Sequence, residues 1–175
     1  MLLFPADEFG GDISIDGVRV DPEGLRLENP RITGSARDGR PFAVTAEWAL
    51  PDGPDPKAVT LGPLEGETMA GERRLTLTAR GGAFRVEEER LSLEGGVALE
   101  TSDGWRLLAS AAEIDLDDQT LDASGPVTGS GPRGDLEAGS MRAERRADGD
   151  YLWFEDGVRL RIAPPDDPAE SGGDG

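Results

Sequence analysis

The stretch LSLEGGV at residues 91–97 decides the fold, because it returns twice further along the chain. Its counterparts are LDASGPV at 121–127 and LWFEDGV at 152–158. Each copy begins with Leu, ends with Val, and has a turn-forming pair with Gly or Pro immediately before the Val. The copies recur about every 30 residues, an interval typical of stacked repeats in which each unit contacts mainly its neighbours.

The same unit extends upstream in a weaker form. LRLENPRI at 25–32 and VTLGPL at 59–64 have the same order of an alternating run, a turn with Pro, and an apolar residue. About five units are therefore predicted in one domain over residues 13–162. Residues 1–12 are predicted to be an irregular segment, and residues 163–175 a disordered acidic tail. The expected turn markers are Pro30, Pro63, Gly96, Pro126 and Gly157.

Apolar and polar residues alternate inside the units. In LTLTA at 75–79, for example, Leu75, Leu77 and Ala79 alternate with threonines. Alternation over short runs between glycines predicts half-buried strands, and thus an all-β fold. Each unit should hold about four strands of about five residues, separated by glycine turns. These turns are expected at RGG 80–82, EGG 94–96, SDG 102–104 and ADG 147–149.

The composition excludes several classes of function. The chain of 175 residues has a net charge of −18, and Lys57 is its single lysine. Nucleic-acid binding is not expected, because phosphate contacts need clustered positive charge. The chain has no His, which removes the commonest metal ligand and the usual Ser-His-Asp triad. We therefore predict that the protein is not an enzyme and needs no cofactor.

Two acidic clusters could suggest metal binding or hydrolysis, but neither fits the chemistry. EIDLDDQT at 113–120 lacks the central Gly of a calcium loop, and Leu116 interrupts its carboxylates. Glu87–Glu89 fall in an expected turn between strands, where carboxylates are solvated. No catalytic residue and no metal ligand are predicted.

The inward-facing side chains of the stack allow two interpretations. They form a filled core, as most apolar stripes do, or they line a groove for an apolar ligand. The candidate groove residues are Leu77, Phe84, Leu93, Leu99, Leu107, Ile114, Leu121, Leu136 and Phe154.

Two stretches resemble a known family. LENPRITGSARDGRPFAVTAEWA at 27–49 resembles the start of the periplasmic domain of the LptC family, lipopolysaccharide export proteins of Gram-negative bacteria. The stretch 91–131 resembles the OstA-like unit shared by LptC and LptA, and its most specific part is VALETSDGWRLLASAAEID at 97–115. Together the similarity covers residues 13–162.

This resemblance implies a single antiparallel β-jellyroll, or folded V-shaped sheet, with an apolar interior. Proteins similar to LptC accept lipopolysaccharide from an inner-membrane ABC transporter and pass it to LptA, so a non-enzymatic lipid-transfer module with a groove is expected. They lie in the periplasm, tethered to the inner membrane by an N-terminal helix. MLLF before Pro5 is far shorter than the ~20 residues that span a bilayer, so we expect this chain to lack that helix.

Two further interpretations remain open. One is a free periplasmic bridge like LptA, and the other is a secreted acidic β-solenoid acting as a calcium-dependent adhesin or glycan-binding protein. For lipid transfer, burial of acyl chains should dominate binding in so acidic a domain. Arginines such as Arg73, Arg74 and Arg106 could add contacts to lipid phosphates.

The end of the stack offers a partner site. Val158, Leu160 and Ile162 alternate with Arg159 and Arg161 before two prolines, so this run is the expected last strand. An open sheet edge invites pairing with another chain unless it is protected. The resemblance implies an LptA-like partner at this edge, docked by strand addition, and the ABC transporter at the N-terminal end. The other interpretation is that the two arginines and the acidic tail protect the edge.

Overall fold

The computed structural model describes residues 12–14, 16–22, 24–35 and 39–163. The predicted irregular segment and acidic tail lie almost wholly outside these residues. The regular elements of the described part are sixteen β-strands in one sheet, and every recorded pairing is antiparallel. The strands are β1 (Asp12–Ser14), β2 (Gly17–Asp21), β3 (Gly24–Glu28), β4 (Arg31–Ser35), β5 (Pro41–Ala46), β6 (Trp48–Pro51), β7 (Ala58–Leu61), β8 (Leu64–Ala70), β9 (Arg73–Arg85), β10 (Arg90–Thr101), β11 (Arg106–Ala109), β12 (Ala111–Asp115), β13 (Thr120–Gly131), β14 (Gly134–Arg146), β15 (Gly149–Glu155) and β16 (Arg159–Ile162).

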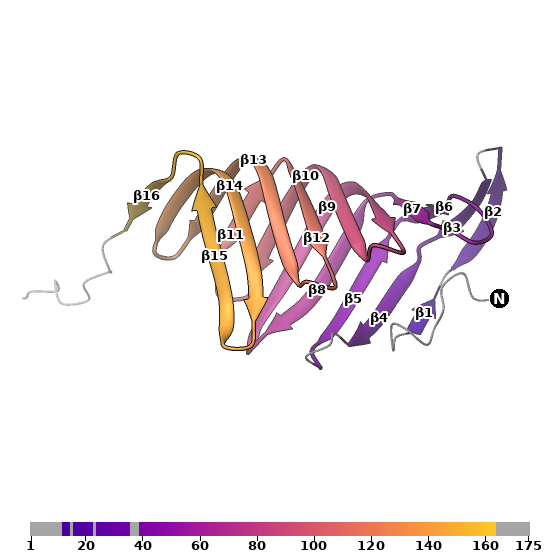
Figure 1. The fold of residues 1–175 in the computed structure, drawn as a ribbon, viewed down its shortest axis with the longest axis horizontal. Helices are drawn as coiled ribbons and strands as arrows, with labels where there is room; N and C mark the ends of the chain where they lie inside the picture. Colours follow the sequence, from indigo (N-terminus) through magenta and orange to yellow (C-terminus); the bar gives the residue numbers. More distant parts are fainter. Residues whose placement is uncertain (1–11, 15, 23, 36–38, 164–175) are drawn as a thin grey trace, which may run out of the picture.

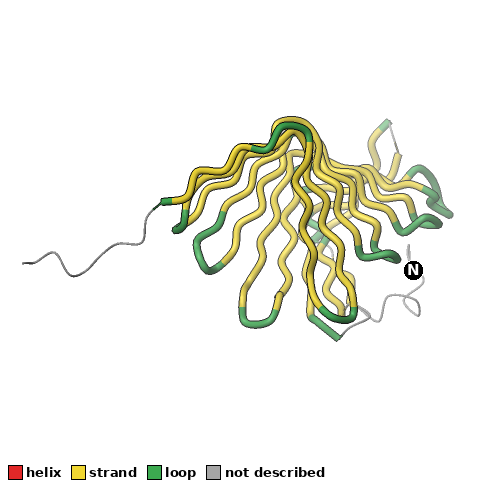
Figure 2. The backbone as a smooth tube through the Cα atoms, turned by 60° about the vertical axis from the view of Figure 1, so that its left-hand side comes forward, coloured by secondary structure: helices red, strands yellow, loops and turns green. Residues whose placement is uncertain are grey.

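The sheet has two arms that meet along a bend. The first arm contains β1, β4, β5, β8, β11 and β16, and the second contains β2, β3, β6, β7, β12 and β15. The long strands β9, β10, β13 and β14 give one half to each arm; β10, for example, pairs with β11 through one half and with β12 through the other. Figure 1 shows the strands following one another from end to end, and Figure 2 shows the arms descending from a common ridge.

We call this bend the crease. Main-chain hydrogen bonds continue across it: Gly96 donates to Ser110, and Ser110 donates to Ser124, both at 3.1 Å. In β10 and β13 the register shifts by a bulge at the same level, between Glu94 and Val97 and between Ser124 and Val127. A bulge bends a strand without ending its pairing. The strands therefore turn the corner instead of stopping at it.

Two of the predicted glycine turns are wrong for this reason. Residues 80–82 lie inside β9, and residues 94–96 form the bulge of β10. The positive φ of Gly95 and Gly96, +80° and +99°, serves the bulge and not a chain reversal. The predicted pairs of short strands are consequently single bent strands of 12 or 13 residues in β9, β10, β13 and β14.

The predicted fold class is confirmed. The chain is all-β, with a single antiparallel sheet folded into a V. Turns occupy residues 102–104 and 147–148, as expected. The five marker residues all lie at the crease. Three of them connect a strand of one arm to a strand of the other: Pro30 between β3 and β4, Pro63 between β7 and β8, and Gly157 between β15 and β16. The other two, Gly96 and Pro126, lie in the middle of the bent strands β10 and β13.

The packed core lies along the inside of the crease. Leu93 and Val97 flank it on β10, and Ala123 and Val127 flank it on β13; all four are buried. They belong to one cluster drawn from both arms, whose other buried members are Ala46, Leu64, Ala79, Ala112 and Met141. Farther from the crease most of the same face is half-buried, so a thin core gives way to two partly open walls. Val59, which pairs with Phe84, is an exception at 2% exposed and belongs to a second buried cluster with Leu27 and Ala49.

Candidate functional site

An apolar row runs along the inner face of the first arm. Leu77 pairs with Leu99, Leu99 with Leu107, and Leu107 with Gly129, which in turn pairs with Leu136. Directly paired residues project from the same face of a sheet, so the four leucines share one wall. A Cβ on Gly129 would lie 2.7 Å from a methyl carbon of Leu107, so glycine leaves the room in which this leucine packs.

Two rows line the second arm. Farther from the crease, Phe84 pairs with Leu91, Leu91 with Ile114, and Ile114 with Leu121. Phe84 and Ile114 thus lie in one row with Leu91 between them. Nearer the crease, a parallel row extends from Leu93 to Phe154; its members are Leu93, Ala112, Ala123, Met141 and Phe154.

The nine predicted groove residues therefore share the inner face, but they are not equivalent. Leu93 is 1% exposed and belongs to the packed core. The other eight are half-buried, which leaves an apolar surface on each wall. The two interpretations of the interior thus apply at different depths: the crease is packed, and the walls above it are partly open. A ligand-lining role for the eight remains a prediction.

This apolar inner face reaches both ends of the sheet. At the C-terminal end, Leu152 pairs with Ala143 and Leu160 with Leu136, so both continue the inner rows. Val18 does the same at the other end by pairing with Leu27. The described residues with exposed large apolar side chains at the two ends are Val18, Val20, Leu25, Leu152, Val158, Leu160 and Ile162.

The C-terminal edge consists of two strands, one on each arm. Among the described strands, β15 and β16 each pair only with β14. From the sequence, only β16 was predicted as the open edge, because LWFE at 152–155 resembles an internal copy of the unit. Val158 lies just before β16, and Arg159 lies 3.6 Å from Glu137 with both side chains largely exposed.

The open side of β16 can be assigned from its hydrogen bonds. The Ala163 amide donates to the Arg133 carbonyl at 2.9 Å, one step beyond the pairing of Ile162 with Gly134. Amides along an antiparallel strand point alternately to its two sides. The Arg161 amide therefore points to β14, and the Leu160 amide points away from it, to the open edge.

The acidic run at 113–118 has a structural role. The Asp115 carboxylate accepts hydrogen bonds from the Asp118 amide at 2.8 Å and from Arg90 at 3.1 Å. These two interactions hold the pKa of Asp115 below its usual value. Arg90 also lies 3.3 Å from Glu113. Within the described ranges, no three side chains of the metal-ligating types converge to hold an ion.

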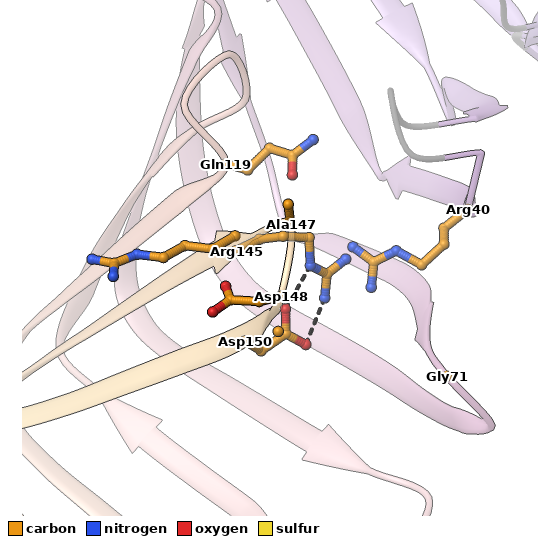
Figure 3. A pocket seen from close by; sticks show the side chains of 9 residues that line it. Arg40, Gly71, Gln119, Arg145, Ala147, Asp148 and Asp150 are labelled. Carbon is orange, nitrogen blue, oxygen red and sulfur yellow. Dashed lines mark hydrogen bonds and ion pairs between the residues drawn. The ribbon is translucent and has the colours of Figure 1, made fainter.

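A cavity lies between the outer ends of the arms, and we call it the mouth cavity (Figure 3). Arg40 reaches it from the first arm and donates to the Met69 carbonyl at 2.8 Å. Arg145 reaches it from the second arm and pairs with Asp150 through two hydrogen bonds of 2.6 and 2.7 Å. The lining residues are Arg40, Gly71, Gln119, Arg145, Arg146, Ala147, Asp148, Gly149 and Asp150.

A family model described as "Lipopolysaccharide-assembly, LptC-related" matches residues 64–160 of this chain. The chain belongs to the LptC-related family. The match runs from the first residue of β8 to Leu160 in β16, so it contains most of the groove walls. Membership of this family does not favour a calcium-dependent adhesin or glycan-binding protein.

Similarity to individual proteins is weaker. The crystal structure of LptH, the LptA homologous periplasmic component of the lipopolysaccharide transport device from Pseudomonas aeruginosa, aligns with 15% identity and a TM-score of 0.48. The alignment covers 69% of this LptC-related chain and 86% of LptH. No curated protein matches the sequence significantly. The described residues include no helix long and apolar enough to cross a membrane.

Contacts of the arginines with lipid phosphates remain a prediction for the LptC-related chain. The three named from the sequence are paired with acids: Arg73 with Asp103, Arg74 with Glu67 and Arg106 with Glu100. Arg40 and Arg145, which share the mouth cavity, were missed. No local signal could have found them, because they meet only when the arms fold toward each other.

Proposed function

We propose that this protein is a non-enzymatic carrier that holds the acyl chains of lipopolysaccharide between its two arms in the periplasm. The observation that carries the proposal is an apolar inner face, half-buried along both walls and open at both ends, in a member of a lipopolysaccharide-assembly family. Each buried methylene contributes about 0.8 kcal/mol. Ten of them would contribute about 8 kcal/mol before the costs of association, enough for transient binding.

In this proposal, lipid enters at the N-terminal end from an inner-membrane ABC transporter and leaves at the C-terminal edge. An LptA-like partner would add strands to β15 and β16 and so join its apolar interior to this one. Exposed apolar residues at both ends support a joined path, because they would otherwise face water. A membrane tether remains an expectation from the family.

Site-specific photo-crosslinking tests the groove. A benzoylphenylalanine at Leu107, on the inner wall, should label lipopolysaccharide, whereas one at the adjacent Leu108 should not. Leu108 is its matched control, because it belongs to the same strand but is exposed on the other face. Ile114 should likewise label and Asp117, in a turn, should not. Equal labelling at Leu107 and Leu108 would refute the proposal.

A further inference from the structure

The mouth cavity brings together two arginines from opposite arms. Phe42 in β5 and Ala143 in β14 project from the inner face, and Arg40 and Arg145 lie two residues farther toward the arm ends. Side chains alternate along a strand, so Arg145 in β14 points to the inside of the V. Arg40 precedes β5, and Figure 3 shows its side chain extending into the cavity. Both arginines stand at the rim of the groove, above its apolar walls.

The geometry at the rim is suited to an anion. Figure 3 shows Arg40 extending from the first arm toward the pair formed by Arg145 and Asp150. The Arg145 side chain is only 21% exposed, so its charge is partly shielded from water. Guanidinium groups attract oxyanions, although Asp150 already offsets part of the Arg145 charge and Asp148 also lines the cavity. Each guanidinium has five N–H donors, so an oxyanion can bind beside the existing hydrogen bonds.

Arg146 lines the same cavity but is directed elsewhere. It pairs with Glu144 at 3.0 Å and lies over the rings of Tyr151 and Trp153, at 4.7 and 5.5 Å from their centroids. Those two rings belong to the outer face, because Tyr151 is paired with Glu144 and alternates with the inward Leu152. The two arginines of the cavity that are directed to the inside of the V are therefore Arg40 and Arg145.

We propose that Arg40 and Arg145 together bind a phosphomonoester on the headgroup of the carried lipid, with its acyl chains directed toward the crease. The inference rests on the proposed function and adds the orientation of the lipid to it. The fork of an arginine matches two oxygens of a phosphate. Gly71 and Gly149, which also line the cavity, carry no side chain that would cover the rim.

Substitution of Asp150 distinguishes a phosphate-binding role of Arg145 from a structural one. Its carboxylate holds Arg145 in place but also repels a phosphate that approaches the same guanidinium. Asp150→Asn should therefore strengthen phosphate binding. If the pair were only structural, the same change would lower stability and leave lipid affinity unchanged.

Binding of lipid A should be compared with binding of its enzymatically dephosphorylated form. The two lipids have the same acyl chains, so the difference in affinity measures the contribution of the phosphates. Wild type should bind the phosphorylated lipid about tenfold more tightly, which corresponds to about 1.4 kcal/mol. Arg40→Gln with Arg145→Gln should abolish this preference and still bind the dephosphorylated lipid. The control is Arg106→Gln with Arg142→Gln, which removes one outer-face arginine from each arm and should keep the preference. Circular dichroism checks that each variant is folded.

The outcomes distinguish this inference from the proposed function. If wild type binds both lipids equally, or the rim variant keeps the preference, the phosphate site is wrong and the groove stands. If wild type binds neither lipid, the proposed function itself fails. Inorganic phosphate should compete only for the phosphate contribution, so it should weaken binding of the phosphorylated lipid by at most about tenfold and leave binding of the dephosphorylated lipid unchanged. An effect of free phosphate on the dephosphorylated lipid that requires Arg40 and Arg145 would mean a separate site for free phosphate and would overturn the assignment to a headgroup.

Discussion

Single residues set the angle of the crease, and Gly125 in β13 is the clearest case. Its φ of +79° lies in the left-handed region, and a Cβ at this position would lie 2.4 Å from the Ser110 hydroxyl. Both features exclude a side chain, because a larger residue would strain its own backbone and displace the neighbouring strand. The bend therefore depends on glycine at this position, because glycine has no side chain.

Gly125→Ala should lower the free energy of unfolding by about 1–3 kcal/mol. Gly66→Ala is the matched control, because a Cβ there would meet only a Val44 methyl at 3.9 Å. That change should be neutral or stabilising by up to about 1 kcal/mol. Urea denaturation of both variants measures the difference, and equal midpoints would contradict this account of the crease.

Asp115 makes stability depend on acid pH. Its pKa is lowered in the folded protein by the Asp118 amide and by Arg90, below an unfolded value of about 3.9. The carboxylate therefore stabilises the fold above about pH 4, and this contribution is lost as pH falls through the lower folded pKa. Asp115→Asn should reduce the melting temperature at pH 7 and flatten its decline below pH 4. Glu87→Gln, which removes one charge from another turn, is the control; an identical acid limb in wild type and Asp115→Asn would count against the assignment.

At the scale of elements, the sequence predicts strands and their faces better than it predicts strand ends. Alternation placed Leu77, Phe84 and Ile114 on the inner face, because the period of two is a local property. Gly95 and Gly96 suggested a turn, because the same positive φ serves a turn and a bulge. Only the hydrogen bonds to strands on both sides distinguish the two, and those partners lie far away in the sequence.

The edge strand β16 permits a sharp test by proline substitution. Leu160→Pro removes an amide that points to the open edge, whereas Arg161→Pro removes one that points to β14. Proline is tolerated on edge strands where the lost N–H faces outward. Leu160→Pro should therefore stay folded, bind lipid and lose the LptA-like partner, while Arg161→Pro should destabilise the C-terminal end. Full retention of the partner by folded Leu160→Pro in a pull-down would exclude β16 as its docking strand.

For the whole molecule, the net charge of −18 opposes the binding of an anionic lipid. Apolar burial must outweigh this repulsion, and salt screens charges without weakening burial. Binding of the dephosphorylated lipid should therefore survive a rise from roughly 0.1 to 1 M NaCl, a range in which the screening length falls from about 10 to 3 Å. Isothermal titration calorimetry at several salt concentrations in this range would measure the affinity. Loss of binding at moderate salt would show that charge, not burial, holds the lipid.

The bulges of β10 and β13 at the crease have a consequence for length. They occupy equivalent places about 30 residues apart, and each interval adds two strands to each arm. Removing residues 97–126 would join the first half of β10 to the second half of β13 and preserve the alternation of strand directions. Since neighbouring strands lie about 4.8 Å apart, the molecule would become about 10 Å shorter with an unchanged cross-section. The number of units thus sets the length of the molecule, while the width between its arms stays constant.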